Sequence, residues 1–239
     1  MAIYAISDLH LALSKYKPMD IFGTGWQNYI ERIETAWRKM IRDDDTVLIP
    51  GDLSWATYIH SAVEDFTFLD ALPGRKILSK GNHDYWWTTM TQMEKFIIEN
   101  DFNTISFIQN NSILVDDVAI AATRGWICPG MPDFKEEDRK IYERELGRLK
   151  LSLSSLPKDP NTAEKLYNKL VVMLHYPPFS PKVQSTNFLE IIQSYEPDYC
   201  LYGHLHGEAV RNEFCGAIGK TEFLLVAADH LKFCPVRLF

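Results

Sequence analysis

The pattern of apolar and polar positions divides the chain into short apolar runs and longer amphipathic segments. Apolar residues recur at every third and fourth position in residues 26–41, 57–69 and 88–98, which predicts three amphipathic helices. Runs rich in β-branched residues predict strands at residues 3–6, 46–49, 76–79, 113–115, 118–121, 170–174, 199–202, 222–226 and 236–238. Because strands and helices alternate in the first half, the pattern predicts an α/β protein with a mixed sheet.

The second half of the chain has a different pattern. Strands there follow one another across short polar turns, near Asn110 and Asp116, which favours an additional antiparallel stretch. Residues 133–150 carry dense charges of both signs, and an apolar seam runs from Tyr142 to Leu156, which predicts one long amphipathic helix. We favour packing of this helix on the sheet, because a partner-binding coiled coil normally needs about three or four heptads.

Composition narrows the class of protein. The chain has 239 residues, of which 46% are hydrophobic and 24% charged, an ordinary globular balance that excludes collagen-like and wholly disordered proteins. This length predicts a single domain over residues 1–239. The net charge of -7 disfavours the broad phosphate-tracking surface of a protein that binds nucleic acid polymers, although a small anionic substrate is compatible with it.

The cysteines and the apolar runs indicate the cellular compartment in which the protein is expected. The four cysteines form no CxxC pair and are too few for a secreted disulfide scaffold, so we expect reduced thiols. No apolar run approaches the roughly 20 residues that cross a bilayer, and the first residues do not resemble a signal peptide. The sequence therefore predicts a soluble, cytoplasmic protein that does not contact membranes.

Five of the seven histidines stand in short polar motifs that directly follow apolar runs. The motifs are Asp8-Leu9-His10, Gly51-Asp52, Gly81-Asn82-His83-Asp84, His175-Tyr176 and Gly203-His204-Leu205-His206. Loops beyond the carboxyl ends of parallel strands converge on one crevice. We therefore expect carboxylates, an amide and several imidazoles to meet at one edge of the sheet.

This set of side chains predicts a metal site. Oxygen donors mixed with imidazoles suit Mn, Fe, Co, Ni or Zn, whereas the absence of thiolate argues against a structural zinc or an iron–sulfur site. Seven ligating side chains are too many for one ion. Two ions about 3.5 to 4 Å apart that share a carboxylate use all seven and leave positions open for water and substrate.

The five motifs, in this order, resemble the pattern of the calcineurin-like metallophosphoesterases, which is DxH, GD, GNH[DE], H and GHxH. The match extends from residue 8 to residue 206 and covers most of the chain. One DxH or GD alone carries little information, but five motifs in the family order are specific. The resemblance implies an α/β fold, a four-layer α/β/β/α sandwich of two mixed β-sheets flanked by helices.

The resemblance also implies the ligands of two metal ions, with Mn, Fe or Zn as candidates. A lone aspartate after a strand is usually a turn or cap residue, and a lone histidine is usually a polar residue with its hydrogen bonds satisfied. Seven such residues in the order of the family motifs favour metal ligation instead. The implied sets are Asp8, His10 and His206 for one ion, Asn82, His175 and His204 for the other, and Asp52 bridging both.

Charge balance predicts the reaction. Two divalent ions exceed the charge of two carboxylates, which leaves a positive centre that attracts anions in an acidic protein. Water between such ions ionises near neutral pH, so we expect hydroxide to attack phosphorus in line.

The resemblance places the His83 side chain against the phosphate, as a hydrogen-bond donor or as the acid that protonates the leaving group. The chain departs here from protein serine/threonine phosphatases, in which GD continues as GDxxDRG. Trp55 stands in place of the second aspartate and no arginine follows, which disfavours a phosphoprotein substrate. Asp84 is the candidate to orient His83 instead. The two histidines outside the motifs, His60 and His230, are interpreted as structural.

Aromatic residues beside the motifs are candidates for a substrate pocket. Stacking on a nucleobase contributes about 1 to 3 kcal/mol, but aromatic residues near strand ends more often fill the core. Arg124 follows another strand and either contacts a phosphate oxygen or forms a salt bridge. The predicted substrate contacts are Trp55, Tyr85, Trp86, Arg124 and Tyr176, with Trp87 a further candidate.

The leading hypothesis is a metal-dependent phosphoesterase that hydrolyses a small phosphodiester or phosphomonoester, so its expected partner is a small phosphorylated substrate. One alternative is a non-catalytic interaction scaffold with the same fold, but such chains often lose ligands and every ligand position is filled here. The other is a nuclease, which predicts a basic groove and a steep salt dependence, and the acidic net charge counts against it.

Overall fold

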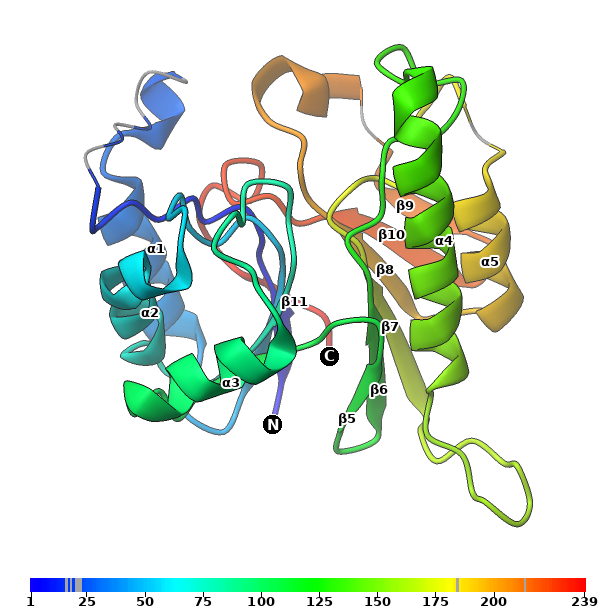
Figure 1. Cartoon of the computed structure of the whole chain (residues 1–239), viewed down its shortest axis with the longest axis horizontal. Coiled ribbons are helices and arrows are strands. Elements are labelled where there is room, and N and C mark those ends of the chain that lie inside the picture. The colour runs from blue at the N-terminus through cyan, green and yellow to red at the C-terminus, as the bar shows by residue number, and fades with distance from the viewer. Residues whose placement is uncertain (16, 18, 20–22, 184, 213) are drawn as a thin grey trace.

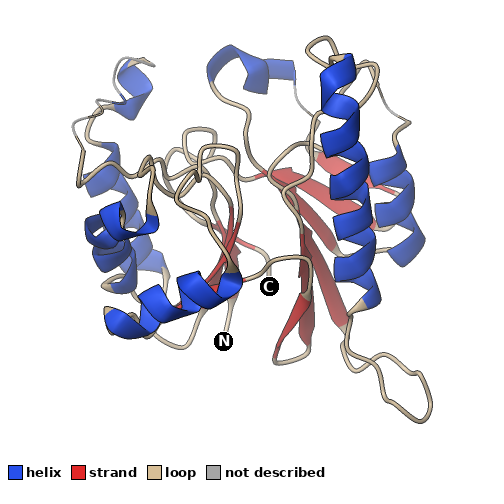
Figure 2. Cartoon of the chain, viewed as in Figure 1, coloured by secondary structure: helices blue, strands red, loops and turns tan. Residues whose placement is uncertain are grey.

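The computed structural model describes residues 1–15, 17, 19, 23–183, 185–212 and 214–239. Two mixed β-sheets lie face to face between two layers of helices (Figure 1; Figure 2). The four-layer α/β/β/α arrangement implied by the family resemblance is confirmed.

The first sheet has the spatial order β11, β1, β2, β3, β4 within the described residues. The strands β1 (Ile3–Ala5), β2 (Thr46–Pro50), β3 (Arg75–Ser79) and β4 (Ile105–Phe107) are parallel, and β11 (Val236–Arg237) is antiparallel to β1. The outer face is covered by helices α1 (Tyr29–Met40), α2 (Val63–Asp70) and α3 (Met90–Glu99) (Figure 1).

The second sheet has the order β5, β6, β7, β8, β10, β9 in the part of the chain that the structure describes. Its central strands β6 (Val118–Ala122), β7 (Lys169–Met173), β8 (Tyr199–Tyr202) and β10 (Thr221–Leu225) are parallel. The edge strands β5 (Ser112–Val115) and β9 (Gly216–Ile218) are antiparallel to their neighbours, which confirms the antiparallel pairing expected in the second half. Helices α4 (Arg139–Ser154) and α5 (Asn187–Tyr195) cover the outer face (Figure 1).

Three apolar clusters hold these layers together. Side chains alternate between the two faces of a strand, so in β2 the side chains of Val47 and Ile49 face the helices and that of Leu48 faces the other sheet. In β7, Val172 likewise packs under the helices and Val171 packs between the sheets. Burial on both faces explains why these strands are continuous apolar runs in the sequence.

Most predicted elements are present, with corrections at their ends. The helix expected at residues 57–69 is α-helical only over α2, because a short 3₁₀ turn (Ile59–Ser61) precedes it. The helix expected from residue 133 begins at Arg139, after a 3₁₀ turn (Glu136–Asp138). The strands β4 and β9 and the helix α5 were not predicted; the two strands have only three residues each.

No helix in the described ranges combines the length and the apolar character needed to span a bilayer.

Candidate metal centre

The candidate ligands lie in loops at the carboxyl ends of parallel strands from both sheets. Asp8 and His10 follow β1, Asp52 follows β2, and Asn82 follows β3. From the second sheet, β7 is followed by His175, and β8 by His204 and His206. Contacts between the two sets of loops, described below, bring all seven predicted ligands into one region.

Four of these ligands have an unusual backbone conformation. The φ angles are 56° at Asp8, 47° at His10, 53° at Asp52 and 71° at His204, all in the left-handed region. This conformation costs a residue with a side chain about 1 to 3 kcal/mol and persists only where the surroundings enforce it. The fold therefore holds these loops in strained conformations that direct the donor atoms toward a common point.

Two glycines allow the backbone to approach the carboxylates closely. A Cβ atom at Gly81 would collide with the Asp52 carboxylate, and one at Gly203 would collide with that of Asp8. Any larger residue at either position would displace a candidate ligand. The glycines of the GNH and GHxH motifs are thus required by packing around the donors.

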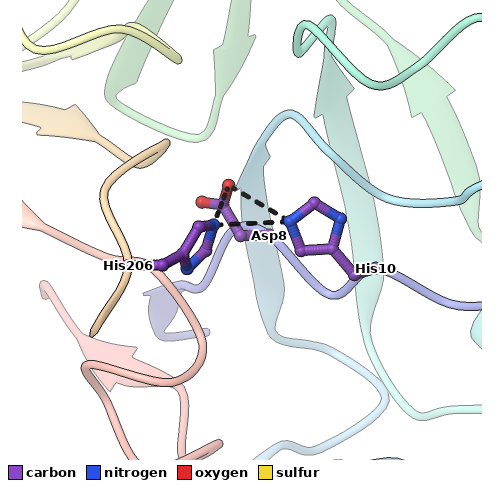
Figure 3. A group of neighbouring side chains, drawn as sticks. All are labelled: Asp8, His10 and His206. Atoms are coloured by element: carbon purple, nitrogen blue, oxygen red, sulfur yellow. Dashed lines mark hydrogen bonds and ion pairs between the residues drawn. The ribbon is translucent and has the colours of Figure 1, made fainter. Parts of the chain in front are cut away.

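Asp8, His10 and His206 form the first donor group (Figure 3). The Nε2 atom of His206 lies 3.3 Å from Oδ1 of Asp8 and 3.4 Å from Nε2 of His10. The third distance, between His10 Nε2 and Asp8 Oδ1, is 3.9 Å. Three donor atoms spaced in this way around one point can share a cation.

Asn82, His175 and His204 form the second donor group. The Oδ1 atom of Asn82 lies 2.6 Å from Nε2 of His175 and 2.8 Å from Nδ1 of His204. The second group is as compact as the first and is built from strands of both sheets.

Asp52 lies between the two groups. Its Oδ2 atom is 3.8 Å from His10 Nε2 in the first group and 3.4 Å from His175 Nε2 in the second. Its Oδ1 atom accepts a hydrogen bond of 2.8 Å from the backbone N–H of His83, which fixes the carboxylate. One carboxylate oxygen therefore faces donors of both groups.

Outer hydrogen bonds direct the ring nitrogens inward. His175 Nδ1 lies 3.0 Å from the carbonyl oxygen of Pro50, and His206 Nδ1 lies 2.9 Å from Oδ1 of Asp229. A proton on each Nδ1 leaves the Nε2 lone pair facing the centre, which is the tautomer that metal ligation requires. The donor set thus fits the metal ions that the resemblance implies.

The electrostatics of the centre favour a cation. Burial alone raises the pKa of the Asp8 and Asp52 carboxyls, but the surrounding imidazoles hold both values below the usual range. Burial, the largest influence on His175, lowers its pKa, yet Asp52, Asp8 and the Pro50 carbonyl together raise it to about 9. The carboxylates thus attract protons to nearby imidazoles, and cation binding is expected to displace those protons.

Two other imidazoles remain neutral. Burial lowers the pKa of His10 to about 4, and burial together with the nearby His175 lowers that of His204 to about 3. Neutral imidazoles are the form that binds metal ions.

The family model described as calcineurin-like phosphoesterase matches residues 1–208. The chain belongs to the calcineurin-like phosphoesterase family. No curated protein matches the chain by sequence.

Solved structures share the fold of this phosphoesterase. A protein of unknown function from Aquifex aeolicus, AQ665, has a TM-score of 0.52 and 18% identity, over 99% of this chain and 95% of that one. Phosphopantetheinyl hydrolase from Mycobacterium tuberculosis has a TM-score of 0.54 and 13% identity, over 95% and 88%. TT1561 from Thermus thermophilus has a TM-score of 0.50 and 12% identity, over 99% and 97%. At these identities the likeness shows the fold alone.

Asp229 is a residue of the phosphoesterase site that the sequence analysis missed. Its Oδ1 accepts a hydrogen bond from His206 Nδ1. Its Oδ2 accepts a long hydrogen bond of 3.4 Å from the backbone N–H of Gly207. Asp229 follows β10, so its position after a strand was the available signal, but it stands outside the five motifs. His60 and His230 are outside both donor groups.

We expect Asp229→Asn to weaken metal binding at the first donor group by about 10- to 100-fold, because a neutral amide holds the proton on His206 Nδ1 less firmly than a carboxylate does and makes the ring a weaker ligand. Calorimetric titration of Mn²⁺ into metal-free protein measures the change. Asp116→Asn, at a turn with a φ of 52° that asparagine tolerates, is the control and should bind as the parent does. Equal affinity in Asp229→Asn and the parent would contradict the orienting role.

The predicted catalytic role of Asp84 needs correction. Its carboxylate accepts hydrogen bonds from the backbone N–H groups of Gly81, Asp52 and Leu53 at 2.8 to 2.9 Å and from the Trp86 indole N–H at 3.0 Å. These donors occupy both oxygens, and no hydrogen bond to the His83 ring is found among the described residues. Asp84 therefore holds the loops that carry Asp52 and Asn82 together.

The prediction that Trp86 contacts the substrate also needs correction, because its ring does not line a substrate pocket. Its ring is 2% exposed and packs edge-on against Phe66 in the core under the first sheet. The other candidate in this segment, Trp87, is buried as well, and its indole N–H donates to Gln109. The alternative interpretation, that these aromatic residues fill the core, is the one that the structure supports.

The remaining predicted contacts lie around the centre. Trp55 stacks on the His10 ring with centroids 4.8 Å apart, and the Tyr176 ring lies 4.1 Å from that of His204. Tyr85 is 63% exposed, and its ring lies 6.2 Å from that of His83. The Arg124 guanidinium forms an ion pair with Glu145 instead of an exposed contact. Trp55, Tyr85 and Tyr176 therefore remain candidate substrate contacts.

Proposed function

We propose that this phosphoesterase hydrolyses a small phosphomonoester or phosphodiester at a centre of two metal ions. The observation that carries the proposal is the position of Asp52 Oδ2, which faces donor nitrogens of both groups. A carboxylate shared between two compact donor groups is the arrangement of a two-metal hydrolase. Mn, Fe and Zn all suit the mixture of imidazole, carboxylate and amide donors.

The proposed mechanism assigns roles to the residues of the chain. The first group would hold one ion through Asp8, His10 and His206, the second would hold the other through Asn82, His175 and His204, and Asp52 would serve both. Ions bound here lower the pKa of water and neutralise charge on the phosphoryl oxygens. No side chain needs to form a covalent intermediate.

His83 is proposed to act on the phosphate or the leaving group. Its ring packs against Trp55 with centroids 4.5 Å apart, and its Nδ1 is buried without a hydrogen-bond partner among the described residues. Trp55, which replaces the aspartate found in protein phosphatases, thus contacts the ring by packing. Burial, the largest influence, lowers the pKa of His83 and favours its neutral ring, which can still donate a hydrogen bond.

We expect His83→Ala to lower kcat by about 10²- to 10³-fold, because a positioned proton donor is lost from the transition state. Metal content, measured by elemental analysis, should stay that of the parent because His83 belongs to neither donor group. His60→Ala, at an exposed residue of the 3₁₀ turn before α2 that belongs to neither donor group, is the matched control and should keep full activity. A parent-like kcat, or loss of metal, would show that the assigned role is wrong.

The direct test of the proposed function is turnover by the purified protein with Mn²⁺, Fe²⁺ or Zn²⁺ supplied. The substrates are nitrophenyl phosphate and bis-nitrophenyl phosphate, followed by a panel of phosphomonoesters, cyclic nucleotides and glycerophosphodiesters. Turnover together with two metal ions per chain supports the proposal. Full metal content without turnover favours the scaffold alternative, and preference for polymeric nucleic acid with a steep salt dependence favours a nuclease.

The proposed location is the cytoplasm. The support is that all four cysteines, Cys128, Cys200, Cys215 and Cys234, are free thiols in the structure.

A further inference from the structure

The loops that follow β1 and β2 run side by side and form one paired segment. The backbone N–H of His10 donates to the carbonyl oxygen of Asp52 at 3.0 Å, and that of Trp55 donates to the carbonyl oxygen of Leu11 at 2.9 Å. Leu11 and Ser54 form a parallel bridge between the two loops. The parallel pairing of β1 with β2 thus continues beyond the strand ends, to the residues around the candidate metal centre.

One carboxylate from α2 joins the far ends of both loops. Asp65 is fully buried, and its Oδ1 accepts a hydrogen bond of 2.8 Å from the backbone N–H of Leu13. Its Oδ2 accepts a hydrogen bond from the hydroxyl of Ser54. Leu13 stands three residues after His10, and Ser54 directly precedes Trp55. Asp65 therefore ties the loop that carries a candidate ligand to the loop that carries a candidate substrate contact.

The Asp65 carboxylate is buried without a positive partner. No lysine, arginine or histidine forms an ion pair with it in the part of the chain that the structure describes. Burial, the largest influence, raises the pKa of this carboxyl, and the hydrogen bonds from Ser54 and Leu13 oppose the shift. A buried acid without a cation costs folding free energy, whereas the next residue on α2, Phe66, packs in the apolar core. The contacts that Asp65 makes to the two loops therefore account for an acid at this position.

These contacts hold the chain on both sides of Trp55. The hydroxyl of Ser54, which donates to Asp65, also accepts a hydrogen bond of 3.0 Å from the backbone N–H of Ala56. The Trp55 ring packs against the His83 ring with centroids 4.5 Å apart. Since Nδ1 of His83 has no hydrogen-bond partner among the described residues, the position of that ring depends on this packing. Direct contacts thus lead from Asp65, through the Trp55 segment, to His83.

His10 has anchors that do not involve Asp65. Its carbonyl oxygen accepts a hydrogen bond of 2.8 Å from the Tyr29 hydroxyl on α1, and its backbone N–H donates to the loop after β2. Both hydrogen bonds remain when Asp65 is replaced. We therefore expect the loss of Asp65 to displace Trp55 and His83 and to leave the first donor group intact.

We propose that Asp65 is a positioning residue of this phosphoesterase, which sets the place of the Trp55 ring and, through it, that of the His83 ring. The inference rests on the proposed function, in which His83 acts on the phosphate or the leaving group. Asp65 itself does not contact the substrate. A displacement of about 1 Å in a catalytic group lowers turnover by up to about 100-fold, so the hydrogen bonds of Asp65 are expected to affect kcat and not metal binding.

The test measures kcat and KM for nitrophenyl phosphate hydrolysis under saturating Mn²⁺. For Asp65→Ala we expect kcat to fall by about 10- to 100-fold with metal content unchanged, because the Trp55 segment loses its anchor. Ser54→Ala removes the hydroxyl alone and should also lower kcat, so it decides the question if Asp65→Ala does not fold. In a Trp55→Leu background, Asp65→Ala should change kcat by less than about twofold, since the ring through which it acts is absent.

Asp70→Ala is the matched control. Asp70 also lies on α2, and its Oδ1 accepts hydrogen bonds from the backbone N–H and the hydroxyl of Thr104 at 2.9 and 2.6 Å. Thr104 directly precedes β4, at the end of the sheet opposite the candidate metal centre. The control should lower the midpoint of thermal unfolding and keep the parent kcat. A parent-like kcat in both Asp65→Ala and Ser54→Ala would overturn the inference. So would an equal loss in Asp70→Ala, or an undiminished effect of Asp65→Ala in the Trp55→Leu background.

NMR spectroscopy reads the position of the His83 ring without turnover. Labelling with ¹³C-histidine gives a ring signal for each histidine of the Zn²⁺-loaded protein, and His83→Ala assigns the signal of His83. We expect this signal to shift in Asp65→Ala and to stay in place in Asp70→Ala. If the parent hydrolyses no ester and the signal shifts in this way, the proposed function fails and the positioning role stands. If the parent hydrolyses esters and Asp65→Ala has the parent kcat and His83 signal, the proposed function stands and the positioning role fails.

Discussion

Asp52→Asn is expected to lower the hydrolysis of a nitrophenyl phosphodiester by about 10³-fold or more, because it removes the one negative oxygen that faces both donor groups. The amide oxygen of asparagine can still accept the hydrogen bond that the backbone of His83 now donates to Asp52 Oδ1. The local loop is therefore preserved, and the effect reports on the charge. Asparagine oxygen is a weaker ligand than carboxylate, so the two ions also lose affinity.

Steady-state kinetics with added Mn²⁺ and elemental analysis of the same samples check this prediction. Circular dichroism establishes that the variant is folded, and Asp116→Asn is the matched control for an aspartate-to-asparagine change at a left-handed residue. Turnover at the parent rate with Asp52→Asn would contradict a shared carboxylate.

Removal of metal is expected to abolish activity completely and reversibly. The donor atoms of Asp8, Asp52, His175 and their neighbours lie within a few ångströms of one another and are largely buried, so without cations they hold protons in place of metal ions. Incubation with a chelator, removal of the chelator and addition of Mn²⁺ should restore turnover to the starting value. The measurement is activity together with metal content at each step.

The midpoint of thermal unfolding should fall on chelation and recover with metal, because ions that bind the folded chain alone stabilise it. Secondary structure should be retained, since the apolar clusters under the helices and between the sheets contain none of the ligands. Full turnover in protein shown to be free of metal would reject the metal mechanism.

The fold could be predicted where the apolar pattern extends over a whole helix, or where a strand is buried on both faces and is therefore a continuous apolar run. The continuous apolar runs of β2 and β7 and the three-and-four spacing of α1 are local properties of the sequence, and each is present near its expected position. The strands β4 and β9 were missed because Ser106 in one and Gly216 and Ala217 in the other leave no run of β-branched residues, and they are held by pairing with β3 and β10. That pairing is a tertiary interaction.

The candidate site could be predicted in its ligand types but not in its supporting contacts. The motifs place carboxylates and imidazoles after strands, and the structure brings all of these ligands together. The motif pattern could not separate Asp84, which binds backbone N–H groups, from an acid that orients His83. It also could not show that the Trp86 ring points into the core.

By itself the sequence determined the α/β class, the family and the residues that meet at the candidate metal centre, because periodicity and motif spacing are properties of consecutive positions. Only the tertiary structure decided that Asp52 faces both donor groups, that Asp229 fixes the His206 ring, and that Asp84 accepts the backbone N–H groups of two loops. These contacts join residues from different strands and helices. Their geometry depends on how the two sheets pack, which no local pattern encodes.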